Sequence, residues 1–244
     1  MKKQLRLDKY LADMGVGTRS EVKVIIKKKR VSVNGQIALK DNVKIDIDND
    51  DVLVDGKKIA YVEYEYFMLN KPAGVVSATT DDINKTVVDL IEDKTKDIFP
   101  VGRLDKDTEG LLLLTNDGEL AHNLLSPRKH IDKKYYAIIN GLVDIEHIEQ
   151  FKKGLNINDE YTTKEAILEI ISTDENEGKS EIYVTIVEGK YHQVKRMFKA
   201  ICMEVTYLKR VSMGEICLDE TLSLGEYRRL TEKEISILKN YNKR

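Results

Sequence analysis

Residues 101–118 read VGRLDKDTEGLLLLTNDG, and this stretch decides how the rest of the chain is interpreted. Its four carboxylates are those of Asp105, Asp107, Glu109 and Asp117. A calcium loop beginning at Asp105 would place Asn116 at position 12, where a bidentate carboxylate is required. A phosphatase nucleophile of the DxDx[TV] type needs a hydroxyl or branched residue in fifth position, where Glu109 stands. Neither motif fits this stretch.

The plain interpretation of the same stretch is a polar turn that leads into a strand over 111–115. Asp117 followed by Gly118 is typical of a turn. Asp107 is expected to hydrogen-bond the turn backbone. Asp105 is set apart from both only by motifs elsewhere in the chain.

The composition is that of a globular protein with a highly charged surface, with 41% hydrophobic and 34% charged residues. No apolar stretch approaches the length of a membrane span, and the charged start lacks the apolar core of a signal peptide, so no membrane partner is expected. Cys202 and Cys217 are the only cysteines and form no CxxC motif, which predicts a reducing cytoplasm. The four histidines are scattered without metal-ligand spacing, so no metal is expected.

Basic residues gather in two regions, although the net charge is only −2. Residues 1–30 hold ten Lys and Arg against three carboxylates, and residues 189–210 hold six against Glu204 alone. Clustered basic charge indicates a nucleic-acid partner better than total charge does. For each cluster alone, a solvated helix face is the competing interpretation.

The periodicity predicts two domains. Helices are expected at 4–12 and 18–29, and in the second Arg19, Lys23 and Lys27 recur every four residues on one face. Asn34-Gly35 is a strong hairpin signal, so residues 1–60 are expected to form a compact module with a cationic face.

Residues 64–244 mix strands and helices without regular alternation, which favours an α+β fold with a largely antiparallel sheet. Strands are expected at 66–69, 111–115, 135–139, 165–171 and 181–187. Helices are expected at 86–92, 119–125, 144–153, 193–201 and 231–240.

Two resemblances organise these motifs. Arg6, Asp8 and Leu11, the run TRSEV and the run RVSVNG resemble the alpha-L RNA-binding domain of a small-subunit ribosomal protein. GRLDKDTEGLLLLTNDG, with LNKPAGVVSA (69–78), SPRKHIDKKYYA (126–137) and EGKYHQVKRMFKAI (188–201), is similar to the pseudouridine synthase family. Within that family the chain looks like the RsuA type, which isomerises a uridine in small-subunit (16S) ribosomal RNA.

The resemblance implies the roles of individual residues. Asp105 would be the ionised carboxylate beside the sugar, as nucleophile or as base, and Lys195 would be its charge partner, with Arg196 as the alternative. Tyr135 would lie against the extruded uracil, and Val194 would pack beside it. No metal or cofactor is required by the reaction.

The remaining residues singled out by the resemblance are expected to contact RNA. Arg103 would fill the vacated base position or grip a phosphate, and Arg196 and Lys199 are placed for phosphate. Lys71 would touch the RNA backbone or be structural. His192 is expected to be structural or to contact RNA rather than to act as a general base.

The resulting prediction is a monomeric, cytoplasmic two-domain enzyme acting on small-subunit ribosomal RNA, free or in an assembling particle. EGKYHQVKRM and the absence of a long basic tail after Arg244 favour this over a related large-subunit enzyme. A non-catalytic ribosome-assembly factor is the alternative from another class. Asp105, Tyr135 and Lys195 together argue against it, because binding alone requires none of them.

Overall fold

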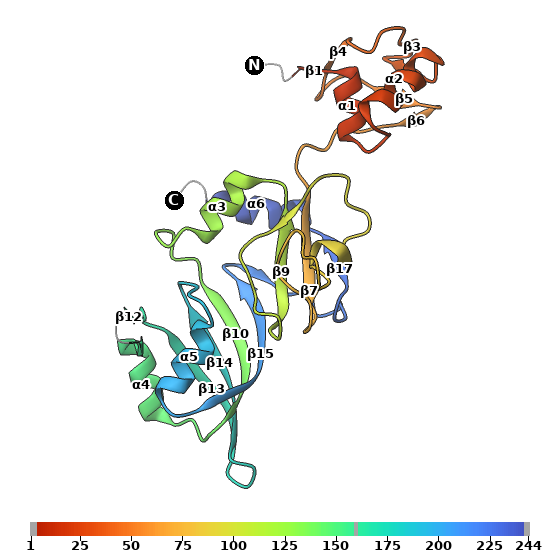
Figure 1. Ribbon diagram of the computed structural model, residues 1–244. Coiled ribbons are helices and arrows are strands. Elements are labelled where there is room, and N and C mark those ends of the chain that lie inside the picture. Colours follow the sequence, from red (N-terminus) through yellow and green to blue (C-terminus); the bar gives the residue numbers. More distant parts are fainter. Residues whose placement is uncertain (1–3, 159–160, 242–244) are drawn as a thin grey trace. The chain divides into compact units, whose positions relative to one another are not determined.

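The computed structural model describes residues 4–158 and 161–241 (Figure 1). The chain divides into two compact units. The smaller unit comprises Met1–Glu65 and Asp93–Asp97, and the larger comprises Tyr66–Glu92 and Ile98–Arg244. The smaller unit therefore includes a short segment from within the sequence of the larger one.

The smaller unit holds two helices and short strands around one core. Its elements are β1 (Gln4–Arg6), α1 (Leu7–Asp13), α2 (Arg19–Lys27), β2 (Val31–Val33), β3 (Gln36–Ile37), β4 (Lys44–Asp46), β5 (Val52–Val54) and β6 (Lys57–Lys58). The strands form a sheet in the order β3-β2-β5-β6 and a separate β1-β4 pair. Helix α2 begins at a capping box, because Thr18 accepts from the Glu21 backbone and Glu21 accepts from that of Thr18. Val22 and Ile26 of α2 are buried in the core and lie on one face of the helix.

The larger unit is built on one sheet. Its first elements are β7 (Tyr66–Lys71), η1 (Val88–Leu90), β8 (Phe99–Pro100), β9 (Glu109–Thr115), α3 (Gly118–Leu125), β10 (Lys133–Asn140), α4 (Ile145–Lys153), β11 (Asn156–Asn158) and β12 (Tyr161–Thr162). They are followed by β13 (Ile167–Asp174), β14 (Lys179–Ile186), α5 (Gln193–Ala200), β15 (Glu204–Met213), β16 (Ile216–Cys217), β17 (Tyr227–Arg229) and α6 (Glu232–Asn240).

In the described residues the sheet runs in the order β13-β14-β10-β15-β9-β7-β17, with β16 beside β15 and β8 beside β9. Its pairs are antiparallel except β9 and β15, which are parallel. The fold is therefore α+β with a largely antiparallel sheet, as the sequence predicts.

Two apolar clusters cover the two faces of the sheet, because successive side chains of a strand point to opposite faces. Leu112 and Leu114 of β9 join the cluster that includes Phe151 of α4 and Phe198 of α5. Leu111 and Leu113 join the cluster that includes residues of α3 and α6. Figure 1 shows α4 and α5 beside β10, β13 and β14, with α3 and α6 near β9.

Four of the five helices predicted for this region are confirmed by α3, α4, α5 and α6. The helix predicted at 86–92 is wrong, since only the short 3-10 turn η1 forms there. Asp117 accepts a hydrogen bond from the Leu120 backbone and so caps α3. The long central strand β15 was not predicted as a strand at all, and it proves to border the candidate site.

Candidate active site

Asp105 lies in the loop between β8 and β9. The start of β9, directly after this loop, pairs with β15. Gly110 pairs with Arg210 in the parallel ladder and has φ of 97°. A Cβ at this position would lie 2.3 Å from the carbonyl oxygen of Arg210. Only glycine accommodates both the backbone angle and this approach. Gly110 therefore allows the end of the Asp105 loop to pack closely on the backbone of β15.

Lys71 supports the same loop from beneath. It is at the end of β7, has no exposed surface, and its ammonium donates to backbone carbonyl oxygens of the loop. The acceptors are those of Thr108 at 2.8 Å, Asp105 and Pro72 at 3.1 Å, and Lys106 at 3.3 Å. Burial lowers the pKa of Lys71 to about 8, while nearby carboxylates oppose that shift.

Two roles were expected for Lys71, contact with the RNA backbone or a structural role, and this arrangement supports the structural one. A side chain with no exposed surface and an ammonium surrounded by carbonyl oxygens cannot reach a phosphate in this structure. Ser77 adds to the support, since its hydroxyl donates to the Leu104 carbonyl at 2.8 Å and accepts from the Leu104 N–H at 3.1 Å. The backbone on both sides of the Asp105 side chain is thereby held.

Two cationic or ionisable groups from the start of α5 face the Asp105 carboxylate. Nζ of Lys195 lies 3.7 Å from Oδ2, and Nε2 of His192 lies 3.5 Å from Oδ1. Asp105 keeps about a quarter of its side chain exposed. His192 precedes α5 in the left-handed region, with φ of 48°, and the exposed Tyr191 ring stacks on it at 3.8 Å. His192, which was expected to be structural or to contact RNA, thus lies directly beside the Asp105 carboxylate.

Lys195 makes its shortest contacts with Asp107 rather than with Asp105. Its Nζ donates to Oδ1 of Asp107 at 2.6 Å and to Oδ2 at 2.7 Å. These hydrogen bonds lower the pKa of the Asp107 carboxyl. The prediction that Asp107 only hydrogen-bonds its turn was therefore incomplete. Lys195 bridges the two carboxylates, so Asp107 holds the cation beside Asp105.

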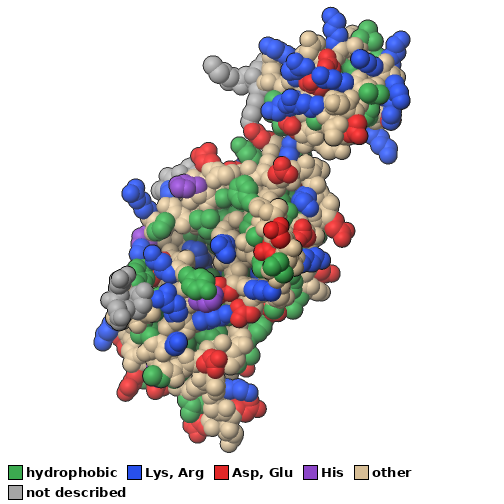
Figure 2. Space-filling view, viewed as in Figure 1, with side chains coloured by type: hydrophobic (Ala, Val, Ile, Leu, Met, Phe, Trp, Pro, Cys, Tyr) green, Lys and Arg blue, Asp and Glu red, His purple; other side chains and the backbone are tan. Residues whose placement is uncertain are grey.

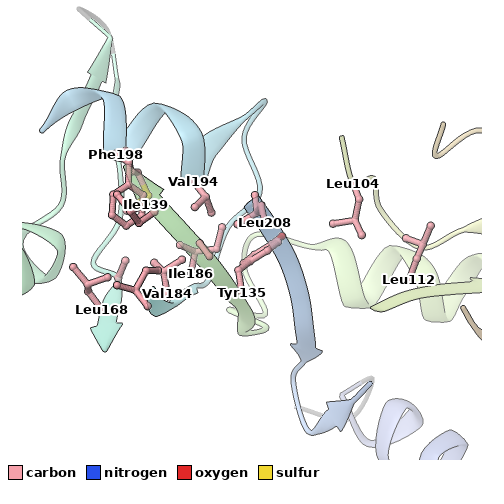
Figure 3. Close-up of a cluster of buried hydrophobic side chains, with 14 of the residues drawn as sticks. Leu104, Leu112, Tyr135, Ile139, Leu168, Val184, Ile186, Val194, Phe198 and Leu208 are labelled. Atoms are coloured by element: carbon pink, nitrogen blue, oxygen red, sulfur yellow. The ribbon is translucent and has the colours of Figure 1, made fainter. Parts of the chain in front are cut away.

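Tyr135 of β10 lies in the same pocket as Asp105 and Lys195. The pocket has about 420 Å³ of empty space and opens to solvent. Its apolar wall includes Val194 and Leu208, and Figure 3 shows the Tyr135 ring beside Leu208 with Val194 close to it. An aromatic ring and aliphatic side chains facing a carboxylate form a place where a flat base could stack.

The other predicted RNA contacts lie at different distances from this pocket. Arg103 is exposed and lines it. Arg196 points away from Asp105, because its guanidinium donates to the backbone carbonyls of Ile157 at 3.1 Å and Tyr191 at 3.4 Å. It is therefore not the charge partner of Asp105 in this structure. Lys199 is exposed on α5.

In the smaller unit the three predicted cations of α2 are all exposed. We call Arg19, Lys23 and Lys27 the α2 basic face. Nζ of Lys23 lies 3.4 Å from Asp41, so one of the three is partly neutralised.

Within residues 4–158 and 161–241, no group of three or more His, Cys, Asp or Glu side chains is arranged to hold a metal ion. No helix in that part of the chain is both long and apolar enough to cross a membrane.

The comparison with known proteins assigns the chain. Residues 65–200 match the family model described as RNA pseudouridylate synthase, and residues 5–52 match that of the S4 domain. The chain belongs to the RNA pseudouridylate synthase family. It is accordingly an isomerase that acts on RNA, with an N-terminal S4 RNA-binding domain.

Relatives of this synthase match over nearly their whole lengths. The uncharacterized RNA pseudouridine synthase YtzG of Bacillus subtilis is 50% identical over 96% of this chain and 98% of its own. The ribosomal small subunit pseudouridine synthase A of Vibrio parahaemolyticus is 38% identical over 97% of this chain and 100% of its own. The ribosomal large subunit pseudouridine synthase B of B. subtilis is 40% identical over 96% of this chain and 95% of its own. A crystal structure of a pseudouridylate synthase is 36% identical and covers 96% of this chain and 99% of its own with a TM-score of 0.67.

Proposed function

We propose that the protein converts a specific uridine of 16S ribosomal RNA to pseudouridine, with Asp105 as the reacting carboxylate. The observation that carries the proposal is the shared pocket of Asp105, Tyr135 and Lys195. The reaction breaks the N1–C1′ bond, turns the uracil and forms the C5–C1′ bond. The proton on C5 is lost and N1 gains one, so nothing is consumed.

The geometry suits this chemistry. Whether Asp105 attacks the ribose carbon or removes a sugar proton, it must be ionised and must face the sugar. The Lys195 ammonium lies 3.7 Å from Oδ2 of Asp105 and the His192 imidazole lies 3.5 Å from Oδ1, so the site provides a cationic partner for the reacting carboxylate. Tyr135 and Val194 would replace part of the stacking that the extruded uracil loses.

Small-subunit specificity rests on the segment EGKYHQVKRM, residues 188–197. This segment supplies His192, Val194 and Lys195 to the pocket. Large-subunit RNA is the second candidate, because a large-subunit relative is 40% identical while a small-subunit relative is 38% identical. Overall identity therefore does not separate the two substrates.

The α2 basic face and Arg103, Arg196 and Lys199 are proposed to contact RNA phosphates without doing chemistry. We place the enzyme in the cytoplasm and propose that it acts as a monomer. Light scattering of the purified protein with and without RNA tests the oligomeric state.

The deciding experiment maps pseudouridines in both ribosomal RNAs from cells lacking this protein. One site in 16S RNA should disappear and should return when the wild-type gene, but not Asp105→Asn, is restored. Loss of a site in large-subunit RNA instead would transfer the proposal to the second candidate. No change in either RNA would overturn it.

A further inference from the structure

A second cavity adjoins the Asp105 pocket and is rich in cations. It has about 1030 Å³ of empty space open to solvent and shares Arg103, Tyr135, Gly189 and Lys190 with the first pocket. Its positively charged lining residues are Arg103, Lys133, Lys164, Lys190 and Arg210, against the single carboxylate of Glu188. Figure 2 shows Lys and Arg side chains gathering around a hollow in this unit, near a His side chain.

Two of these cations, Lys133 and Arg210, are buried in the sheet itself. Lys133 is 8% exposed and Arg210 is 2% exposed. Lys133 and Tyr135 are two residues apart on β10 and so point to one face, and Arg210 of β15 pairs across from Tyr135. The two cations and the Tyr135 ring therefore share one face of the sheet, although apolar residues would ordinarily fill such positions.

Within the part of the chain that the structure describes, no carboxylate forms an ion pair with either cation, although Asp132 and Glu188 act on Lys133 from a greater distance. Nζ of Lys133 donates to the Ile131 carbonyl at 2.8 Å, and Nε of Arg210 donates to the Leu111 carbonyl at 2.8 Å. Nη2 of Arg210 is buried and has no hydrogen-bond partner among the described residues. The nearby Glu188 carboxylate already accepts from the Tyr161 hydroxyl, the Lys164 N–H and the Gln193 amide.

Such an arrangement is costly without an anion. Burial disfavours the charged form, and a like charge nearby disfavours it further. Together these effects lower the pKa of Lys133 to about 8. Burial is the larger cause, and the charge of Arg210 is the smaller one. A bound anion in the cavity would offset both effects.

We propose that Lys133 and Arg210 form a phosphate subsite that holds a phosphodiester group flanking the target uridine. The inference rests on the proposed function and deepens it, since it names the residues that would bind the phosphate backbone of the RNA substrate. A nucleotide whose base lies on Tyr135 has its phosphates within one nucleotide's length of that ring. Phosphate is also the one fully anionic group of RNA, and a guanidinium with an ammonium matches it better than a base edge.

The first test is Lys133→Met, with Lys134→Met as the matched control. Lys134 is the next residue of β10, its side chain pairs with Glu169 at 2.7 Å, and it points to the other face of the sheet. We expect Lys133→Met to weaken binding of the substrate RNA about 10- to 100-fold. The slope of log affinity against log salt should fall by roughly 0.7–0.9. Lys134→Met should change neither quantity.

A second test uses the wild-type protein and substrate RNAs that each carry one neutral methylphosphonate near the target uridine. One position should weaken binding about 10-fold or more, and in Lys133→Met that position should have lost most of its effect. Inorganic phosphate should compete with RNA for the wild-type protein and compete less well for Lys133→Met. If phosphate competes but no methylphosphonate position responds, the subsite binds free anions only and the proposal is overturned.

These outcomes separate the subsite from the enzyme's function. If the wild-type protein forms no pseudouridine, the proposed function is overturned. A wild-type protein that isomerises uridine while Lys133→Met retains its RNA affinity and salt slope fails the subsite alone. The methylphosphonate scan needs no variant, so a flat scan overturns the subsite even if Lys133→Met does not fold.

Discussion

Lys71→Met tests whether this lysine supports the Asp105 loop or contacts RNA. The substitution keeps an unbranched side chain of similar reach and removes the ammonium that donates to loop carbonyl oxygens. An ammonium has three N–H groups, so at most three of the four acceptors are fully served at once. Hydrogen bonds to a charged group contribute about 1.5–3 kcal/mol each, which makes the loss about 5–9 kcal/mol.

Part of that loss is returned because methionine carries no charge to bury. Burial lowers the pKa of Lys71 from 10.5 to about 8. This shift corresponds to about 3 kcal/mol at neutral pH, at about 1.4 kcal/mol for each pH unit. The net destabilisation is therefore about 2–6 kcal/mol, comparable to the roughly 3–5 kcal/mol lost when a buried ion pair is broken. A loop released by even 1 Å should slow the reaction on the order of 100-fold.

The assay pairs urea unfolding with single-turnover isomerisation across a salt series. We expect a lower free energy of unfolding and a slower rate at saturating RNA, with an unchanged slope of log affinity against log salt. Lys199→Met provides the contrast, since an exposed phosphate contact should lower affinity and reduce that slope by roughly 0.7–0.9. Lys85→Met, an exposed lysine elsewhere in this unit, controls for the substitution itself. A Lys71→Met variant with normal stability and rate but a shallower salt slope would refute the loop-support argument.

Three further predictions follow from the same geometry. Asp105→Asn should abolish detectable isomerisation while RNA binding persists, whereas Asp107→Asn, which only releases Lys195, should slow it about 10-fold or less; equal losses would contradict the assignment. Replacing the α2 basic face with three glutamines should reduce the salt slope by roughly 2–3, and an unchanged slope would show a merely solvated face. Burial lowers the pKa values of Lys71 and Lys133 from 10.5 in the unfolded chain to about 8 in the folded protein. Between these two pH values the folded protein therefore binds fewer protons than the unfolded chain. Stability measured by urea unfolding should therefore rise from pH 7.5 to 9.5, and a fall would contradict these shifts.

The sequence predicted the helices of the larger unit well because each carries a clear apolar stripe or a cap. Helix α5 is the best case, since Val194, Met197 and Phe198 recur at helical spacing in the sequence and are all buried. The resemblance implies that the motif residues Asp105, Tyr135 and Lys195 act at one site, and the structure brings them into one pocket. What the spacing could not give was the pairing of Lys195 with Asp107, because that depends on how the turn presents two carboxylates.

Strand β15 was missed for a physical reason. Arg210 stands where the apolar residue after Leu208 would be expected, and a register shift between Arg210 and Ser212 breaks the alternation before Met213. Lys133 does the same in β10, where the apolar run was expected to begin only at Tyr135. A cation at an inward position therefore hides the strand from an analysis of apolar periodicity, although once the strand is known it indicates the second cavity.

The two buried lysines show why burial alone does not decide a residue's role. Both are almost inaccessible, and burial lowers both pKa values to about 8. Yet Lys71 is surrounded by four carbonyl oxygens, whereas Lys133 donates to one and lies beside Arg210. Methionine at Lys71 therefore leaves acceptors unserved and should destabilise the fold, while methionine at Lys133 removes a poorly compensated charge and should stabilise the RNA-free protein. Opposite signs in one unfolding experiment would separate a lysine that holds the loop from a lysine kept, at a cost in stability, for an anion that arrives with the substrate.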